Sequence, residues 1–297
     1  MSQRKDEMFT FSPSPLQAIT WADKQCWVKR DDLLHPTLNG NKARKLLYYL
    51  QHDFPNKTTL VSCGGNQSNA MLALAILAQL KQWQFCYYLK PLPQALHQQT
   101  HGNFQQAVAL GMNYREIMDF SQIHLAPTDL WIPQGGASAE ASWGLQTLAD
   151  ELTIFIQEKQ LTDVGIFVPS GTGATAFYLQ QFCDYPVYTT PCVGSSAYLQ
   201  DSFCQLAIEQ NARYPIILEQ PQKRTFGKPD PTLFAIWQEC CAKTGIEFDL
   251  LYDPLGWLAL QTHQATLPNQ LIYIHCGGLT GNPSMLARYQ RLLRPRS

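Results

Sequence analysis

The sequence predicts an α/β fold built around a mostly parallel sheet, and three observations support this prediction. Short apolar segments of strand length alternate with longer helix-like segments along most of the 297 residues, which is typical of strands joined by crossover helices. Two strand-to-helix turns carry glycine together with hydroxyl or amide side chains, as at the ligand-binding edge of such sheets. The hydrophobic content of 45% allows a substantial core, in one large domain or two modest ones.

The expected elements follow one another along the chain. Asn39 and Gly40 both tolerate left-handed backbone, so a sharp turn there should lead into a helix near Asn41. The run TTLVSC at 58–63 has the composition of a buried strand and continues through a glycine turn into the apolar helix 70–80. The same alternation predicts further strands at 85–89, 131–133, 165–169, 187–190, 216–219, 248–252 and 271–275, and helices at 102–110, 143–159, 174–182, 198–210, 231–244 and 283–293.

The charge balance argues against nucleic-acid and membrane partners. Lys and Arg number 22 and Asp and Glu number 23, so the formal charge of -1 leaves no basic footprint for either. Residues 1–7 lack the apolar core of a signal peptide, and no apolar run approaches the length needed to cross a bilayer. We expect a cytoplasmic protein.

The nine cysteines are an odd number and fall inside expected strands and helices, which favours reduced thiols over a disulfide scaffold. No Cys-x-x-Cys occurs, and no cysteine pair is matched by a histidine pair at zinc-finger spacing. We therefore expect no metal site.

Lys42 is the candidate for an imine-forming lysine. It would lie in the first turn of the helix that begins near Asn41, where the positive end of the helix dipole disfavours a cation and attracts an anion. Both effects suit a neutral lysine beside a phosphate. The alternative is that Lys42, Arg44 and Lys45 form a solvated basic helix face.

The turn at 169–175, Pro-Ser-Gly-Thr-Gly-Ala-Thr, has the features of a phosphate cradle, because its glycines let backbone N–H groups approach an anion at a helix start. It also fits a loose Gly-x-Gly-x-x-Ala dinucleotide pattern through Gly171, Gly173 and Ala176. No acidic residue lies about 20 positions further on to bind a ribose, which weakens that interpretation. A tight turn needed only for packing is the remaining alternative.

The turn at 64–69, Gly-Gly-Asn-Gln-Ser-Asn, places Gln67, Ser68 and Asn69 at a helix start, where amides and a hydroxyl can bind a carboxylate. Alternatively, Ser68 or Asn69 is simply an N-cap. A third glycine turn at 135–138 does not complete a Gly-x-Ser-x-Gly nucleophile elbow, because position 140 is Glu.

Together these segments resemble the fold-type II pyridoxal-phosphate enzymes, specifically the family of 1-aminocyclopropane-1-carboxylate deaminase and D-cysteine desulfhydrase. Residues 29–32 followed by 40–46 resemble the family's lysine segment, with Asn39 where a glycine is usual, and 64–69 is similar to its Gly-Gly-x-Gln-Ser-Asn turn. Segments 132–138, 170–175 and 274–279 match later family segments in the same order, so the resemblance spans about residues 27–280.

The resemblance implies a tryptophan synthase β-like fold with two open, twisted, mostly parallel sheets flanked by helices. Residues 1–46 and 136–297 would form a large cofactor-binding domain and residues 47–135 a smaller α/β domain, with the cofactor in the cleft between them. By resemblance to the family, Lys42 binds pyridoxal phosphate covalently and later carries protons as a free amine. The resemblance also implies that Asn69 bonds the phenolic oxygen of the cofactor and that Cys276 lies near its ring. The substrate would be bound by Asn66, Gln67 and Ser68, and Ser68 would also assist proton transfer. The phosphate would be bound by Gly171, Thr172, Gly173, Ala174 and Thr175.

One segment departs from the family pattern. Family members carry Asp-Pro-Val-Tyr followed by Glu or Thr where this chain has Asp253-Pro254-Leu255 and then Gly256 and Trp257. No phenol stands at the matching position, and the carboxylate associated with the ring nitrogen in the deaminases is missing as well. A thiol at Cys276 is a poorer partner for a pyridinium nitrogen than a carboxylate.

The resemblance implies an enzyme that removes a small leaving group from a small amino acid and releases a keto acid and ammonia. A D-cysteine desulfhydrase-like elimination is our first expectation, and ring opening by a 1-aminocyclopropane-1-carboxylate deaminase is the second. A non-catalytic pyridoxal-phosphate carrier or sensor remains open, and so does a nicotinamide oxidoreductase if the Gly171 turn binds a dinucleotide. Relatives suggest a homodimer.

Overall fold

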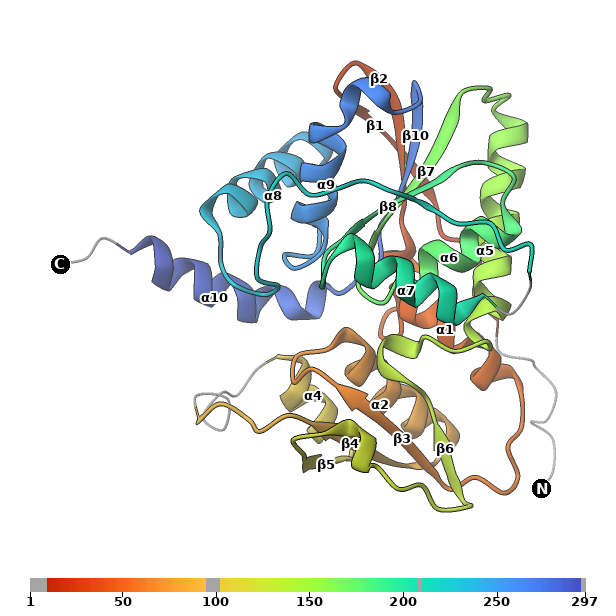
Figure 1. Cartoon of the computed structure of the whole chain (residues 1–297), viewed down its shortest axis with the longest axis vertical. Coiled ribbons are helices and arrows are strands. Elements are labelled where there is room, and N and C mark those ends of the chain that lie inside the picture. The colour runs from red at the N-terminus through yellow and green to blue at the C-terminus, as the bar shows by residue number, and fades with distance from the viewer. Residues whose placement is uncertain (1–9, 95–101, 208–209, 295–297) are drawn as a thin grey trace.

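In a computed structural model, which describes residues 10–94, 102–207 and 210–294, the chain forms two β-sheets flanked by helices (Figure 1). The larger sheet has six strands in the order β1-β2-β10-β7-β8-β9, and the smaller has four in the order β5-β4-β3-β6. Of the strand pairs described, β1–β2 is antiparallel and all others are parallel. The predicted α/β class with two mostly parallel sheets is confirmed.

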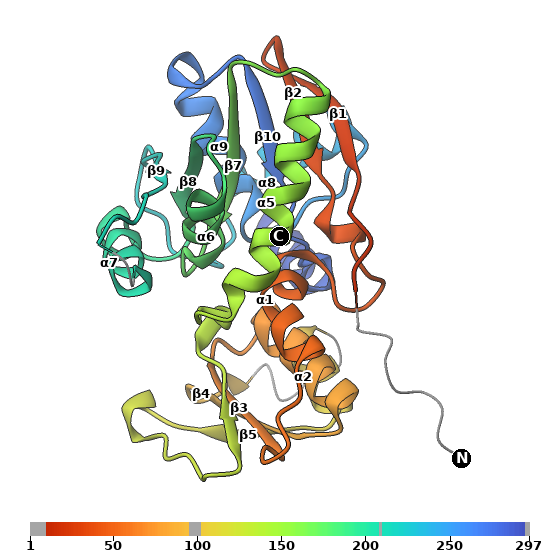
Figure 2. The same ribbon diagram turned by 90° about the vertical axis from the view of Figure 1, so that its right-hand side faces the viewer.

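Helices cover both faces of the six-stranded sheet, so its central strands are apolar on both sides. On one face α5, α6 and α7 share an apolar core with β7 and β10, and on the other face α8 and α9 share a second apolar core with the same strands. Figure 2 shows α5 running along this sheet down to α1. The bounds are β1 Leu16–Trp21, β2 Lys24–Lys29, β7 Val164–Ser170, β8 Val187–Pro191, β9 Ile216–Ile217, β10 Gln270–Ile274, α5 Ala141–Glu158, α6 Ala174–Phe182, α7 Ser196–Leu206, α8 Pro231–Thr244, α9 Asp253–Thr262 and α10 Asn282–Leu293.

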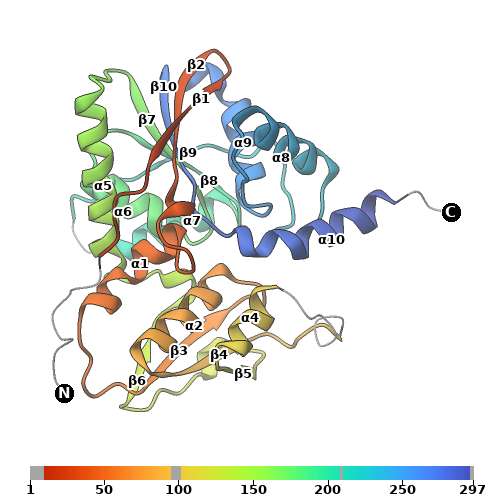
Figure 3. The same cartoon turned by 180° about the vertical axis from the view of Figure 1, so that it is seen from behind.

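The four-stranded sheet is covered by α1, α2 and α4, which share one apolar core with β3 and β4. The bounds are α1 Gly40–Gln51, β3 Thr59–Gly64, α2 Asn69–Lys81, β4 Gln84–Leu89, α4 Asn103–Ala109, β5 Met112–Glu116 and β6 Asp129–Trp131. Seen from behind, α1 lies between the two sheets (Figure 3). It also packs closely on α5, where a Cβ added at Gly144 would come within 2.0 Å of the Arg44 carbonyl oxygen.

A buried ionic network fixes the back of α1. Arg44, only 1% exposed, donates to both carboxylate oxygens of Asp31 and of Glu151, and Lys29 lies 2.5 Å from Glu151. Two cations therefore face two carboxylates, so the charge is balanced away from water. The alternative of a solvated basic helix face is wrong, because Arg44 and Lys45 are buried and Lys42 is half-buried.

The predicted strand at 248–252 is wrong. Asp249 accepts hydrogen bonds from the backbone N–H groups of Leu251 and Tyr252, and this side-chain turn competes with strand pairing. Helix α9, which was not predicted, begins directly after it at Asp253.

Smaller differences concern ends and turns. The β1–β2 hairpin and β5 were not predicted, β9 has only two residues, and the short strand expected at 131–133 lies earlier, as β6. Helix α7 ends at Leu206 instead of near 210, and residues 208 and 209 lie outside the described residues. Gly40 is left-handed with φ +66°, as expected, but Asn39 is extended with φ -123°.

The strands of the smaller sheet all lie between Thr59 and Trp131, and the helices that follow Gly136 all belong to the larger half. This arrangement supports a division near 136, and we propose 1–46 with 136–297 and 47–135 as the two domains. The first boundary falls within α1, whose apolar side chains pack with the smaller sheet. Within the described part of the chain, no helix is both long and apolar enough to cross a membrane.

Candidate active site

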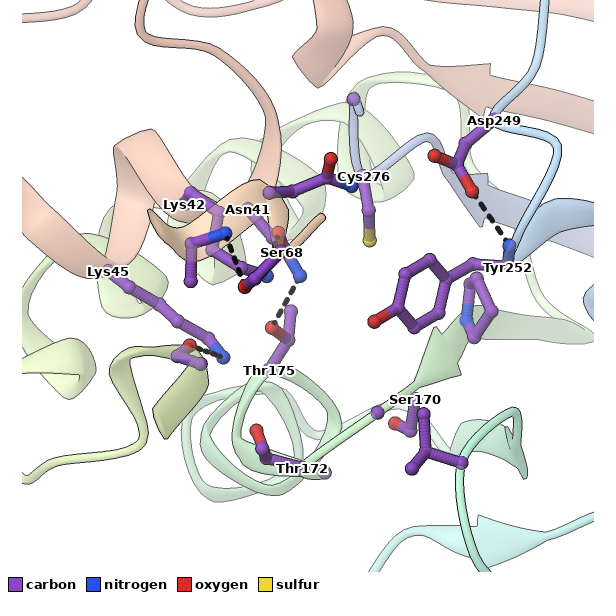
Figure 4. Close-up of a pocket in the computed structure, with 18 of the residues that line it drawn as sticks. Asn41, Lys42, Lys45, Ser68, Ser170, Thr172, Thr175, Asp249, Tyr252 and Cys276 are labelled. Atoms are coloured by element: carbon purple, nitrogen blue, oxygen red, sulfur yellow. Dashed lines mark hydrogen bonds between the residues drawn. The ribbon is translucent and has the colours of Figure 1, made fainter. Parts of the chain in front are cut away.

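The candidate active site is a cavity between the two sheets, at the carboxyl ends of β3, β7 and β10, where open parallel sheets bind ligands. Its walls come from the start of α1, the turns after these three strands, the short helix η3 (Gln134–Gly136) and the segment before α9. The cavity brings together most of the residues expected from the sequence, as Figure 4 shows in part: Lys42, Ser68, Asn69, Gly171, Thr172, Gly173, Thr175 and Cys276.

Three expected residues lie elsewhere. The side chain of Ala174 packs into the core beneath α6 and does not line the cavity, because it follows the glycine turn on the buried side of the helix. Asn66 and Gln67 line a second, adjoining cavity. Ser68 borders both cavities, so the expected carboxylate-binding group is divided between them.

The turn before α1 delivers Lys42 to the cavity. Gly40 lies against the turn after β10, where a Cβ would come within 1.9 Å of the Cys276 carbonyl oxygen, and the Asn41 N–H donates to that same oxygen. The Lys42 Nζ donates to the Asn41 Oδ1 at 2.9 Å. Burial lowers the pKa of the Lys42 ammonium, although Cys276 and Asp249 oppose the shift. A lowered pKa increases the share of neutral amine, which is the nucleophilic form.

The glycine turn between β7 and α6 forms the opposite wall. Gly173 is left-handed with φ +78°, and the Thr175 hydroxyl accepts a hydrogen bond from the Asn41 amide at 3.2 Å. The backbone of Gly171, Thr172 and Gly173 lines the cavity at the positive end of α6. This geometry suits an anion such as a phosphate.

Lys45 adds a cation to this wall, a role that sequence reasoning missed. It is buried, borders the same cavity, and donates to the Gly135 carbonyl at 3.1 Å, where Gly135 packs on Thr172. Burial first, and repulsion from Lys42 second, hold the pKa of Lys45 well below its usual value. An anion bound at the glycine turn would stabilise the charged form. Its spacing of three residues from Lys42 was the available signal.

The α2 turn is fixed by Asn103, a fully buried residue that sequence reasoning also missed. Its amide donates to the Asn69 Oδ1 at 2.7 Å, and its backbone N–H donates to the Gln67 Oε1 at 3.0 Å. The Asn69 Nδ2 is thereby left as a donor beside Gly278. Ser68 is the N-cap of α2, accepting from the N–H groups of Ala70 and Met71, so the capping role is confirmed.

Asp249 and Tyr252 bring to the cavity a carboxylate and a phenol, the two groups that the sequence lacks at the positions matched with the family. Both line the cavity, from a segment just before the one compared with the family. The Asp249 Oδ2 is buried and has no hydrogen-bond partner among the described residues. Burial, with repulsion from Asp253 second, raises the pKa of Asp249 to about 7.

Gly256 and Trp257, where the family pattern breaks, do not border the cavity. Trp257 is buried and stacks on Tyr273 with ring centroids 4.5 Å apart. A Cβ added at Gly256 would come within 2.7 Å of the Tyr273 hydroxyl. The sequence difference therefore alters core packing on this side of the sheet.

The residues present fit pyridoxal phosphate. The glycine turn and Lys45 suit its phosphate, and the Lys42 amine suits its aldehyde. The Asn69 Nδ2 offers a donor, and the unpartnered Asp249 Oδ2 offers an acceptor for a ring nitrogen that carries a proton. Burial raises the pKa of the Cys276 thiol, so it lines the site as a neutral group.

Gly173→Val is expected to weaken cofactor binding by roughly tenfold or more, since strain of this kind costs about 1–3 kcal/mol. A Cβ there would meet the Phe203 ring at 2.6 Å, so the substitution acts through α7 and the backbone of the turn. Cofactor affinity can be measured by titrating the apoprotein. Gly245→Val is the matched control, because Gly245 is also left-handed but has open space around it. Equal affinities in the two variants would remove the glycine turn from the site.

No family model matches this chain. A Thermotoga maritima protein named "Putative 1-aminocyclopropane-1-carboxylate deaminase" is 22% identical over 316 aligned residues, covering 96% of this chain and 98% of the relative. A protein of Oryza sativa subsp. japonica named "Putative D-cysteine desulfhydrase 2, mitochondrial" is 24% identical, covering 88% of this chain and 79% of the relative.

Solved structures share the fold. The crystal structure of an ACC deaminase homologue superposes with a TM-score of 0.72 and 18% identity, over 93% of this chain and 94% of the other. In sequence and in fold, the chain therefore resembles the 1-aminocyclopropane-1-carboxylate deaminase and D-cysteine desulfhydrase family of fold-type II pyridoxal-phosphate enzymes.

Proposed function

We propose that the protein is a pyridoxal 5'-phosphate-dependent lyase or deaminase that removes a small leaving group from an amino acid and releases a keto acid and ammonia. The observation that carries this proposal is the Lys42 amine, which borders the same cavity as an anion-binding glycine turn and a buried, unpartnered carboxylate. A D-cysteine desulfhydrase-like elimination remains the first candidate, supported by the rice relative.

The cofactor would be held at both ends by this chain. Lys42 would attach it covalently, Asn69 would donate to its phenolic oxygen, and Cys276 would lie near its ring. When bound, the cofactor supplies an electron-withdrawing ring that stabilises negative charge on the substrate α-carbon. Its phosphate would be bound by Lys45, the Thr175 hydroxyl and the backbone of Gly171, Thr172, Gly173 and Ala174.

The chain's own groups would then move protons and orient the substrate. Once released from the cofactor, the Lys42 Nζ would take the proton from the substrate α-carbon, a role favoured by its lowered pKa. Ser68 would bind the substrate carboxylate, and Asn66 and Gln67, which line the adjoining cavity, would contact the rest of the substrate. The Ser68 hydroxyl, on the same side of the cavity as Lys42 in Figure 4, would assist that proton transfer.

Ring opening of 1-aminocyclopropane-1-carboxylate is the second candidate, and Tyr252 favours it. The phenol of Tyr252 borders the cavity, so the absence of a tyrosine at position 256 no longer argues against this reaction. Burial raises the pKa of Tyr252, which keeps the phenol protonated and able to donate a proton. A non-catalytic carrier would have no need of these proton-transfer groups.

The substrate test compares keto-acid release from purified, cofactor-loaded protein. We expect more pyruvate from D-cysteine than 2-oxobutyrate from 1-aminocyclopropane-1-carboxylate, because sulfide is a good leaving group whereas ring opening must break a carbon–carbon bond. Efficient ring opening would reverse this order and favour the deaminase. A yellow, cofactor-loaded protein that is inactive on D-cysteine, L-cysteine, D-serine and the cyclopropane acid would favour the carrier.

Ser68→Ala is expected to slow turnover by roughly 100-fold if Ser68 assists proton transfer. The same change removes an N-cap, which costs about 1 kcal/mol of stability. Ser195→Ala is the control, since Ser195 caps α7 through the Tyr198 N–H at 3.2 Å and does not line the first cavity. Similar turnover in both variants would reduce Ser68 to a capping residue.

We further propose a cytoplasmic homodimer. The location is supported by the cysteines, all of which are free thiols, as is usual in a reducing compartment. The dimer is supported only by the family resemblance, and sedimentation of the purified protein tests it.

A further inference from the structure

A second cavity of about 590 Å³ adjoins the first. The two share five wall residues, so a substrate bound near Ser68 can extend a side chain into the second space: Ser68, Asn69, Gln134, Val193 and Tyr252. The far wall comes from the loop at 225–228 and from the start of α10. This space exceeds what the side chain of cysteine or of a cyclopropane amino acid can fill.

The walls of the second cavity carry only positive charge. Lys228 and Arg288 line it, and no acidic residue is among the described residues that do so. Neither forms an ion pair with another described residue, and the Arg288 Nη1 donates to the Met285 sulfur, a weak acceptor, at 3.3 Å. The chain as a whole is nearly neutral, so this local excess does not follow from composition.

Further donors lie in the same walls. The Gln67 Nε2 is buried without a hydrogen-bond partner among the described residues, while its Oε1 is occupied by the Asn103 N–H. Ser284 lies in the first turn of α10, at the positive end of that helix. Lys228 and Arg288 are exposed and can be solvated by water, whereas the Gln67 Nε2 is buried without a partner among the described residues. Two cations and this amide donor suit an anionic group better than an apolar one.

We infer that the second cavity binds an anionic side-chain terminus, so that the preferred substrate is an amino acid whose side chain ends in a carboxylate or a phosphate. The inference rests on the proposed function, because it takes the first cavity as the place of the reacting α-carbon. Uncharged substrates such as D-cysteine would react through the same groups but bind more weakly.

The reaction needs only water as a second reactant. With O-phosphoserine, the α-proton leaves to a base and the Cβ–O bond breaks, and hydrolysis gives pyruvate, ammonia and phosphate. With S-carboxymethylcysteine, the Cβ–S bond breaks, and the products are pyruvate, ammonia and thioglycolate. No oxidant or reductant is involved.

The test pairs each anionic amino acid with a neutral analogue, in both enantiomers. O-phosphoserine is compared with serine, and S-carboxymethylcysteine with S-carbamoylmethylcysteine, which replaces only the charge. Binding to the cofactor-loaded protein is measured by calorimetry, and keto-acid release is measured separately. We expect at least one anionic member to bind about tenfold more tightly than its neutral partner. The two pairs distinguish a phosphate from a carboxylate preference.

Variants then test whether Lys228 and Arg288 cause the preference for anionic amino acids. The double variant Lys228→Gln with Arg288→Gln should lose it, and added salt should weaken it in the wild type. Arg291→Gln is the matched control, since Arg291 is also exposed on α10 but does not line the cavity.

The outcomes separate this inference from the proposed function. Equal binding within both pairs, no binding of either member, or a preference unchanged in the double variant would overturn the inference, even if D-cysteine yields pyruvate. A charge preference that depends on Lys228 and Arg288, without keto acid from any amino acid, would support the inference and overturn the lyase.

Discussion

Lys42→Ala is expected to abolish covalent attachment of pyridoxal phosphate and the visible absorbance that accompanies it. Lys42 is the lysine whose Nζ is placed by the Gly40 turn, beside Asn41 and opposite the glycine turn of β7 and α6. Its lowered pKa increases the share of the neutral amine, the form that attachment requires. Absorbance spectra of the wild type and the variant, reconstituted at equal cofactor concentration, provide the measurement.

Lys45 is the competitor, because it borders the same cavity and burial also lowers the pKa of its ammonium. Its Nζ is directed to the Gly135 carbonyl, next to Thr172, on the phosphate side. Lys45→Met should therefore weaken cofactor affinity while leaving attachment at Lys42 intact. Borohydride reduction followed by peptide mapping identifies the modified lysine, and a label on Lys45 in the wild type would contradict the assignment.

Much of the site could be predicted because its walls are formed by short segments that can be recognised in the sequence. Strand-to-helix turns rich in glycine place backbone N–H groups at helix starts wherever the sheet is parallel, and this holds for the turns at 64–69 and 171–175. The position of Lys42 could be predicted for a similar reason. Glycine is one of the few residue types that readily adopt the left-handed backbone found at Gly40, just before Lys42.

The rest depends on contacts between distant segments. Asp249 enters the cavity because the segment before α9 is held by Asp253 and by Asn282, whose Oδ1 accepts from the Leu250 N–H. Asn103 reaches Asn69 and Gln67 across 34 and 36 residues of chain. The hydrophobic periodicity of a segment predicts its own helix or strand, but it does not predict hydrogen bonds to residues far away in the sequence.

The β1–β2 hairpin illustrates a different limit. Its turn consists of Ala22 and Asp23, both left-handed with φ +50° and +59°. Turns of this type ordinarily carry Asn-Gly or Asp-Gly, so the residues that signal a hairpin are absent from the sequence. Strand pairing with β10 and the packing of the sheet override the local preference.

The difference from the family pattern at 256–257 lies in the core and not in the cavity. Gly256 stands at the position matched with the tyrosine of the family pattern, but Gly256 and Trp257 pack in the core, and Tyr252 brings a phenol to the cavity from four residues before Gly256. The chemistry of the site is therefore better judged from which side chains border the cavity than from aligned positions.

Among substitutions that leave every polar side chain of the site chemically unchanged, Gly40→Ala is expected to cause the largest loss of stability and of cofactor attachment. A Cβ at position 40 would stand 1.9 Å from the Cys276 carbonyl oxygen, in a backbone with φ +66°. Because this contact is with backbone, α1 must move away from the turn after β10, and the hydrogen bond from the Asn41 N–H to the same oxygen must lengthen or break. Strain and overpacking together should lower the free energy of unfolding by about 2–5 kcal/mol.

The displacement would carry Lys42 with it, so cofactor attachment should fall well beyond the loss of stability. Gly245→Ala separates the two causes, because Gly245 has φ +68° but nothing within 4 Å of an added Cβ, and it lies outside the cavity. That control should lose about 1 kcal/mol, the strain of the left-handed backbone alone, and retain full attachment. Denaturant unfolding of both apoproteins and the absorbance of both reconstituted proteins provide the comparison. Full attachment in Gly40→Ala would show that the position of Lys42 does not depend on the contact between α1 and the turn after β10.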